Sequence, residues 1–481
     1  MSKFYLTTPI YYVNAMPHIG HAYTTLAADA IARYYRQKIG EDRVFFLTGT
    51  DEHGAKIAEA AERDGKNPKL FCDEIATLFV STWQRLNISH NHFIRTTDEY
   101  HEQGAAEFLR ALKVKGALYE GDYAGLYCNG CESFITEKQL REDGLCKDHL
   151  RKPERIVEKN WFFKLDKYLP KIQTIIEQGA ISVLPEARTE EVLGLFRQGM
   201  ENFSVSRPNV RWGIPLPWDN AQTMYVWVEA LLNYWTAVHK RQMFWPPDLQ
   251  IIGKDIIKFH CIYWPAMLLA YYDGDAEKIP KTIFAHGFFT VNGQKMSKTL
   301  GNVIDPNDLC DRYGRDGARY LILSQFPFGS DGDIEEGKFD EKYNADLANG
   351  IGNLVSRVTT LCVKQITDWQ KFWKLEEEQE IKGEKQDAKE LINNFMLYEM
   401  IQSVIQDARL CDEILAKEKP WQYDKQKEQE KITADLAYLI SRILSIAKDI
   451  APFLPLTTKT IREKIDISKK IIEPVTLFPR K

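Results

Sequence analysis

The chain has 481 residues, of which 44% are hydrophobic and 27% are charged, and its formal net charge is −5. This length predicts two to four domains, and the acidic balance argues against a protein coated in basic residues while leaving room for local nucleic-acid-binding patches. Eight cysteines are too few for a disulfide scaffold of this size, and no signal peptide is evident. No run of 18 residues is apolar and free of charged residues, so no membrane span is expected. We therefore expect a cytoplasmic protein that does not enter the membrane.

The first part of the chain alternates between strand and helix patterns. Strands are predicted within residues 4–12 and 42–54, and helices over residues 22–40 and 55–63. From about residue 115 to residue 217 the sequence is rich in turns, which indicates an inserted domain. The alternation resumes with a predicted helix at 224–240 and continues through residues 249–270 and a predicted strand at 282–291. These segments predict a Rossmann-type parallel sheet that is split by an insertion.

Long helical periods follow residue 343, and no strand is expected there. The helices are predicted at 347–363, 391–415 and 432–454, and the charged run 375–390 reads as a solvated loop or helix face. The expected domains are the first half of the Rossmann domain (1–115), the insertion (116–225), the second half (226–290), a loop and linking region (291–343) and an all-α helical bundle (344–481).

Two histidines open the first predicted helix, in "PHIGHAYT" at residues 17–24. His18 and His21 share a helix face, and Gly20 lets a ligand approach the backbone. Phosphates bind where parallel strands end and helices begin, and two imidazoles there can donate hydrogen bonds to a reacting phosphate. The alternative is a solvent-exposed helix start that happens to hold two histidines.

Two lysines lie on a turn-rich segment, "VNGQKMSKTLGN", directly after a predicted strand. Lys295 and Lys298 on a movable loop can grip a triphosphate most tightly in the transition state. Taken alone, the segment could also be a polar surface hairpin. Together with the two histidines, it predicts a nucleotide site.

The two motifs resemble the paired signatures of the class I aminoacyl-tRNA synthetases. The longer segments "TTPIYYVNAMPHIGHAYT", "FLTGTDEHG", "YVWVEALLNY", "IGKDIIKFHCIYWPAM" and "HGFFTVNGQKMSK" resemble the methionyl-tRNA synthetases over essentially the whole chain. Thr299 stands where many members have serine and keeps the hydroxyl group. The resemblance implies a methionine–tRNA ligase that uses L-methionine, Mg²⁺-bound ATP and tRNA(Met). It also implies that residues 344–481 bind the anticodon.

The resemblance also implies the site residues. His18, His21, Lys295 and Lys298 are expected to be catalytic, and the expected ATP contacts are His18, Gly20, His21, Gly253, Asp255, Lys295, Met296, Ser297 and Lys298. The expected methionine pocket comprises Ile10, Tyr12, Asp51, Trp227, Ala230, Tyr234, His260 and Trp264, although the helical spacing of Trp227, Ala230 and Tyr234 alone would also suit a core stripe. The implied anticodon readers are Asn353, Arg357 and Trp421, which by pattern alone would pass for a polar face and a packed tryptophan.

Three cysteines and a histidine form a spaced cluster, Cys128-x2-Cys131 and Cys146-x2-His149. Two such pairs provide four ligands for a tetrahedral structural Zn²⁺, because no position is left open for water. His149 stands where many family members have a fourth cysteine.

Two other functions stay open on sequence grounds. One is a class I synthetase for another amino acid, although the insertion of about 100 residues is short for an editing domain. The other is a non-catalytic RNA-binding protein on a synthetase scaffold. The chain ends soon after the predicted bundle, which favours a monomer.

Overall fold

The computed structural model describes residues 3–128, 133–135, 140–147, 150–208, 210–296, 301–380, 386–425 and 427–481. Contacts within the chain divide it into two compact units, which are described separately below. Unit 1 holds Met1–Met16, Arg43–Ser81 and His90–His286, and unit 2 holds Pro17–Asp42, Thr82–Ser89 and Gly287–Lys481. Among the described segments, no helix is both long and apolar enough to cross a lipid bilayer.

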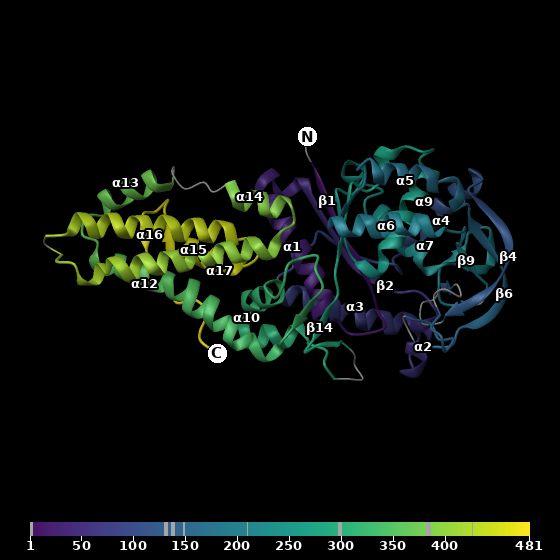
Figure 1. The fold of residues 1–481 in the computed structure, drawn as a ribbon, viewed down its shortest axis with the longest axis horizontal. Coiled ribbons are helices and arrows are strands. Elements are labelled where there is room, and N and C mark those ends of the chain that lie inside the picture. Colours follow the sequence, from purple (N-terminus) through teal and green to yellow (C-terminus); the bar gives the residue numbers. More distant parts are fainter. Residues whose placement is uncertain are drawn as a thin grey trace. The chain divides into compact units, whose positions relative to one another are not determined.

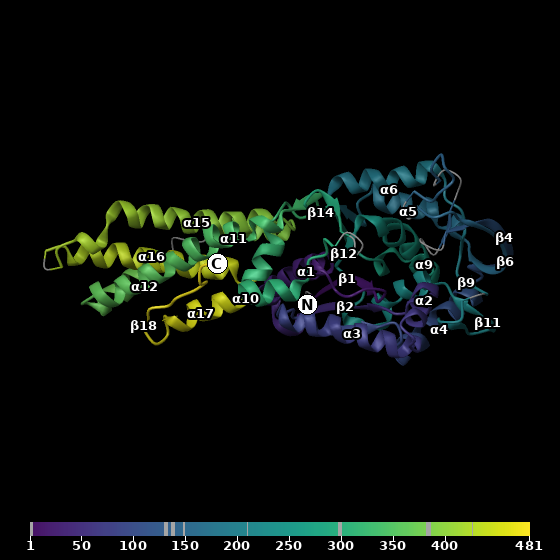
Figure 2. The ribbon, with the colours of Figure 1, turned by 90° about the horizontal axis from the view of Figure 1, so that it is seen from below.

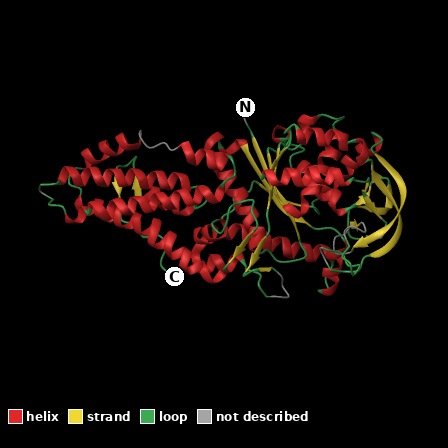
Figure 3. Ribbon diagram, viewed as in Figure 1, coloured by secondary structure: helices red, strands yellow, loops and turns green. Residues whose placement is uncertain are grey.

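Unit 1 is built on a six-stranded sheet, drawn as arrows in Figure 1 and in yellow in Figure 3. All neighbouring strands are parallel, and their order is β3–β2–β1–β12–β13–β7. This confirms the predicted parallel, Rossmann-type sheet. The strand order reverses between β1 and β12, and in such sheets ligands bind where the carboxyl ends of the strands meet this reversal. The strands are β1 (Phe4–Tyr12), β2 (Val44–Asp51), β3 (His92–Arg95), β7 (Ser182–Leu184), β12 (Leu249–Gly253) and β13 (Thr282–His286).

Helices bury the faces of this sheet because its strands are apolar on both sides. All eight residues of β2 are buried, and Phe45 and Leu47 share one core with Phe108 of α4 and Trp264 of α9. The helices are α2 (Ala55–Arg63), α3 (Pro68–Arg85), whose last residues belong to unit 2, α4 (Glu99–Val114), α5 (Leu169–Glu177), α6 (Glu186–Gln198), α7 (Val226–Leu231), α8 (Asn233–Thr236) and α9 (Trp264–Tyr271).

Two small sheets form within the segment predicted as an insertion. One has the order β5–β4–β6–β8 and the other β10–β11–β9, and all their pairings are antiparallel. The long curved pair β4 and β6 stands out in Figure 3. Strand β7 also comes from this segment but pairs with β13, so it extends the main sheet. The strands are β4 (Leu118–Cys128), β5 (Ser133–Ile135), β6 (Glu154–Phe163), β8 (Phe203–Ser204), β9 (Ser206–Arg207), β10 (Pro215–Leu216) and β11 (Asp219–Met224).

Several predicted elements are divided in the structure. The helix expected at 224–240 is two short helices, α7 and α8, preceded by β11. The strand expected at 282–291 is two strands that belong to different sheets, β13 and β14. The chain passes between them at Gly287, where a Cβ atom would lie 2.5 Å from the backbone of Ser330. Periodicity alone does not report such a close approach.

Unit 2 combines a small sheet with a helical region. Helix α16 packs against α12, α13 and α15, and α12, α15 and α16 run side by side in both views (Figure 1, Figure 2). The elements are α1 (Ile19–Ile39), β14 (Phe289–Val291), β15 (Gln294–Lys295), α10 (Pro306–Leu323), β16 (Gly332–Ile334), α11 (Phe339–Tyr343), α12 (Asn353–Gln365), α13 (Trp369–Glu380), α14 (Gln386–Asn393), α15 (Leu397–Glu418), α16 (Gln429–Ile450), α17 (Pro455–Lys464), β17 (Ile465–Asp466) and β18 (Ile471–Ile472).

Two predictions for this helical region need correction. The expected absence of strands after residue 343 is wrong, because β17 and β18 form an antiparallel pair. The helix expected at 391–415 is interrupted between α14 and α15, where Phe395 has a φ of 60°. A phenylalanine with positive φ cannot continue a right-handed helix.

A buried ion pair ties the first helix of unit 2 to α10. Arg319 and Asp29 are both fully buried, and Nη2 of Arg319 lies 2.7 Å from Oδ2 of Asp29. The same guanidinium donates to the carbonyl oxygens of Leu86, Pro452 and Phe453. Because breaking one partner of such a pair leaves an uncompensated charge, this contact fixes how α1 packs within unit 2.

Candidate functional site

The two histidines lie at the first turn of α1 in unit 2. His18 is the N-cap residue, and its Nδ1 accepts a hydrogen bond of 3.1 Å from the backbone N–H of Gly20. Nδ1 of His21 accepts one of 3.3 Å from the N–H of His18, and the two rings stack with centroids 3.8 Å apart. Burial and the neighbouring His18 lower the pKa of His21 well below its ordinary value. In its neutral form each ring therefore carries its proton on Nε2, as a hydrogen-bond donor.

Gly20 leaves no room for a side chain. A Cβ atom there would lie 2.8 Å from Cε1 of His18 and 3.4 Å from the methyl carbon of Met296. The segment around Met296 thus reaches the helix that carries the histidines, and the N–H of Ile19 also donates to the carbonyl of Ile304 at 3.0 Å. Unit 2 brings these two sequence motifs together.

The lysine motif is only partly described. Lys295 lies in β15, and its backbone pairs with that of Thr290 in β14. Ser297, Lys298 and Thr299 lie outside the described residues.

A cavity of about 320 Å³ opens in unit 1 at the reversal of strand order. It gathers residues from β1, the end of β2, α7, α8 and the segment after β12. Seven of the eight residues predicted for the methionine pocket line it, and Trp264 does not, because it lies fully buried with its ring 6.2 Å from that of Tyr234. The lining residues are Pro9, Ile10, Tyr12, Asp51, Lys56, Val226, Trp227, Ala230, Leu231, Asn233, Tyr234, Asp255, Ile256 and His260.

Two polar side chains that line this cavity, Tyr234 and His260, are bonded to each other. Nδ1 of His260 donates to the carbonyl of Ile256 at 3.0 Å, so its Nε2 accepts from the hydroxyl of Tyr234 at 2.8 Å. Burial lowers the pKa of His260 to about 4, and the ring is neutral at physiological pH. Trp227 stacks on Phe259 with ring centroids 4.1 Å apart. The cavity therefore presents aromatic surface, which suits an apolar, polarizable side chain.

Charged side chains also line the cavity. Asp51 ends β2 and is 9% exposed, and Lys56 places its ammonium group 5.9 Å from the centre of the Tyr12 ring. Gly253 ends β12, and a Cβ atom there would lie 2.5 Å from Oδ1 of Asp255. Lys56 escaped the sequence interpretation because a lysine near a helix start carries no distinguishing pattern.

A buried cluster behind the cavity was also missed. Glu229 accepts hydrogen bonds from His53 and His101, and the three side chains are at most 4% exposed. Next to it, Glu52 is fully buried and makes two contacts with Arg95, of 2.7 and 2.8 Å. The available signal was a carboxylate inside the apolar run "YVWVEALL", since an unpaired glutamate is almost never buried.

The predicted zinc ligands are described in part. Cys128 and Cys146 are both buried and belong to one small cluster with Ile135. Cys131 and His149 lie outside the described residues. Among the residues that are described, no group of three histidine, cysteine or acidic side chains could hold a metal. Two of the four expected donors thus share one apolar environment.

Two of the predicted anticodon readers lie close together in unit 2. The guanidinium carbon of Arg357 in α12 is 5.4 Å from the centre of the Trp421 ring, and Nη1 of Arg357 is 3.5 Å from Asp412. Trp421 is 41% exposed. Asn353 is exposed at the start of the same helix. An exposed aromatic ring beside an arginine is a surface on which an unstacked base can lie.

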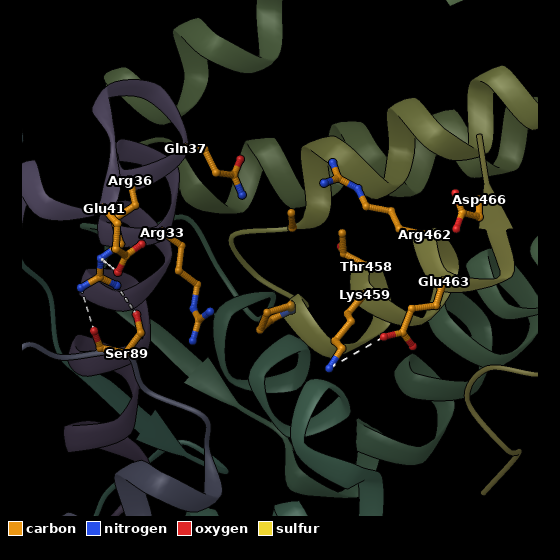
Figure 4. A pocket seen from close by; sticks show the side chains of 12 residues that line it. Arg33, Arg36, Gln37, Glu41, Ser89, Thr458, Lys459, Arg462, Glu463 and Asp466 are labelled. Atoms are coloured by element: carbon orange, nitrogen blue, oxygen red, sulfur yellow. Dashed lines mark hydrogen bonds and ion pairs between the residues drawn. The ribbon is translucent and has the colours of Figure 1, made fainter. Parts of the chain in front are cut away.

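Unit 2 also holds a cavity of about 700 Å³, lined by residues of α1 and α17 among others (Figure 4). Its charges are mixed and largely paired among themselves: Arg36 contacts Ser89 and Glu41, and Lys459 faces Glu463 at 3.8 Å. None of the residues predicted from the sequence lines it. Figure 4 shows α1 on one side, with Arg33, Arg36 and Gln37, and α17 on the other, with Thr458, Lys459 and Arg462.

Comparisons with known proteins agree in one family. The family described as tRNA synthetases class I (M) matches residues 4–152 and 142–359. The methionine–tRNA ligase of Thermotoga maritima is 39% identical over 97% of this chain and 76% of its own length, and that of Nostoc sp. is 37% identical over 99% and 92%. The solved methionyl-tRNA synthetase of Mycobacterium tuberculosis in complex with methionyl-adenylate has a TM-score of 0.88 at 30% identity, over 100% of this chain and 99% of that one. The chain belongs to the methionyl-tRNA synthetases of class I.

Proposed function

We propose that the cavity of unit 1 binds the methionine side chain and that the first turn of α1 in unit 2 binds the phosphates of ATP. The chain is a methionine–tRNA ligase, which couples ATP to the attachment of methionine to tRNA. The reaction has two steps. The methionine carboxylate attacks the α-phosphate of ATP to form methionyl-adenylate and release pyrophosphate, and a terminal ribose hydroxyl of the tRNA then attacks the activated carbonyl.

One observation supports the methionine assignment above all. Seven of the residues expected from the family line one cavity, although they lie far apart in the sequence, from Ile10 to His260. The hydroxyl hydrogen of Tyr234 and both ring nitrogens of His260 are already engaged in hydrogen bonds, so none of them needs a polar group of the substrate side chain as a partner. Asp51, which lines the same cavity, would then hold the substrate ammonium group through charge.

The proposed roles in phosphate transfer follow from the hydrogen-bond pattern of α1. Since Nδ1 of His18 and of His21 already accepts a backbone N–H, the Nε2–H of each ring would donate to the α-phosphate as negative charge builds up. Lys295 and Lys298 would neutralise the pyrophosphate, and Mg²⁺ would enter bound to ATP. Gly253 and Asp255 would contact the nucleotide. No protein nucleophile is required, because positioning and electrostatics lower the barrier.

The remaining proposals concern tRNA and metal. Asn353, Arg357 and Trp421 would read the anticodon of tRNA(Met), with the bundle at 344–481 as the anticodon-binding domain. Cys128, Cys131, Cys146 and His149 would hold one structural zinc ion, whose binding energy stabilises the insertion. The burial of Cys128 and Cys146 in one cluster supports this fit.

The test of the pocket is to fill it. Ala230 is 4% exposed and lines the cavity, so leucine at this position occupies the space proposed for the thioether. For Ala230→Leu we expect the KM for methionine in ATP–pyrophosphate exchange to rise at least about tenfold. The KM for ATP should stay within about twofold. An unchanged KM for methionine would refute the assignment of this cavity.

A further inference from the structure

The two walls of the proposed methionine pocket are joined by a hydrogen bond outside it. Asp51 ends β2 on one wall, and Ala230 belongs to α7 on the other. His53 follows Asp51 by two residues, Glu229 precedes Ala230 by one, and Nδ1 of His53 lies 3.0 Å from Oε1 of Glu229. Neither His53 nor Glu229 lines the cavity. Their contact therefore spans the same two elements without touching the space for a ligand.

A second histidine binds the other oxygen of the same carboxylate. Nε2 of His101 in α4 lies 3.1 Å from Oε2 of Glu229, and its Nδ1 lies 2.8 Å from the hydroxyl oxygen of Thr236 in α8. Glu229 thus connects four elements: the end of β2, α4, α7 and, through His101, α8. Its side chain is 1% exposed, so water does not compete for these bonds.

The charges in this cluster support one another. Burial acts to raise the pKa of Glu229, but attraction to His53 and hydrogen bonds from both histidines outweigh it and hold the pKa below its ordinary value. Burial acts to lower the pKa of His53, but Glu229, with smaller contributions from Glu102 and Glu52, raises it above 6.5. Glu52 is itself bound by Arg95. A charged glutamate in this position is costly to remove because its partners lose their compensation.

We propose that Glu229 is a positioning residue that holds α7 and the end of β2 at the separation that fits methionine. This inference rests on the proposed assignment of the cavity to methionine. Since the cluster lies outside the cavity, its loss should alter the fit of the amino acid without removing any contact with ATP. The KM for methionine should respond, and the KM for ATP should not.

The protonation of His53 gives the proposal a pH signature. Because its pKa in the folded protein is raised, the ion pair with Glu229 is fully formed below about pH 6.5 and is lost as the pH rises through the raised value. The KM for methionine should therefore be higher at pH 8.5 than at pH 6.5. The charged groups that act on His53 are Glu52, which directly precedes it, Glu102 from α4 and Glu229 from α7. His101 from α4 binds the other oxygen of Glu229.

Glu229→Gln keeps the size of the side chain and removes its charge. For this variant we expect the KM for methionine at pH 6.5 to rise about tenfold, as for a lost charge-assisted hydrogen bond. The KM for ATP should stay unchanged, and the step between pH 6.5 and 8.5 should disappear. Glu229→Asp keeps the charge with a shorter reach, so its KM should rise less and its pH step should remain.

The control is Glu107→Gln on α4, because Glu107 faces His239 at 3.9 Å but is 57% exposed. This control should match the unchanged protein in both KM values. If Glu229→Gln keeps the normal KM for methionine, or raises both KM values together with a lower melting temperature, the positioning role is refuted. If Glu229→Gln does not fold, the pH step and selective KM change of Glu229→Asp decide. Ala230→Leu tests the pocket itself. If the assignment of the pocket is wrong, the KM for methionine of Ala230→Leu stays unchanged, whatever the result for Glu229→Gln.

Discussion

Gly20→Ala probes the geometry of the histidine turn with a single methyl group. The new Cβ would lie 2.8 Å from Cε1 and 3.0 Å from Nδ1 of His18, whereas ordinary contacts begin at 3.4 Å. The imidazole must therefore retreat by roughly half an ångström, and its bond to the N–H of residue 20 weakens. Since misplacing a catalytic group by about 1 Å can cost about a hundredfold, we expect kcat/KM for ATP to fall about 10- to 100-fold.

The stability of this variant should change little. Alanine is a better helix former than glycine by up to about 1 kcal/mol, and Gly20 lies in the first turn of α1. Because this gain offsets the weakened N-cap bond, we expect a melting temperature close to that of the unchanged protein, measured by circular dichroism, together with slow ATP–pyrophosphate exchange. Gly194→Ala is the matched control, because a Cβ there meets only Nη2 of Arg197, at 3.7 Å, within α6. Normal exchange by Gly20→Ala would refute the role given to the turn.

Three further predictions address other parts of the chain. Trp421→Ala should lower kcat/KM for tRNA about 10- to 100-fold, which corresponds to the loss of one stacked base. ATP–pyrophosphate exchange without tRNA should stay unchanged, and an equal loss in the two assays would contradict an anticodon role. Cys128→Ser should reduce the zinc content below one per chain, measured by atomic emission, and lower the melting temperature of the insertion; full zinc occupancy would oppose the predicted ligand set. Because burial lowers the pKa of His260 to about 4, the unfolded state takes up its proton first as the pH falls from 6.5, and stability drops. Between pH 6.5 and pH 4, the free energy of unfolding of His260→Gln, measured in denaturant titrations, should fall by about 3 kcal/mol less than that of the unchanged protein. Identical pH profiles of the two proteins would show that His260 does not cause the loss of stability.

Local patterns determined the class of the fold and the family. Apolar runs such as 44–51 predict buried parallel strands because each residue of such a strand needs apolar surroundings on both faces, and the parallel sheet is confirmed. The histidine and lysine motifs are short segments whose residue types predicted the family, and comparison with known proteins confirms it. The division of the predicted strand at 282–291 was missed because both halves are apolar and only packing separates them.

By itself, the sequence determined which residues carry charge, imidazole or aromatic surface, and for the long periodic segments it predicted the kind of element. Only the tertiary structure decided which of them meet. Glu229 of α7 has no local partner and binds His53, two residues after β2, and His101 of α4, and Arg357 of α12 meets Trp421, which lies 64 residues further along the chain. The physical reason is that helical and strand periods set the face of a residue on its own element, whereas its neighbours depend on how whole elements pack around a shared core.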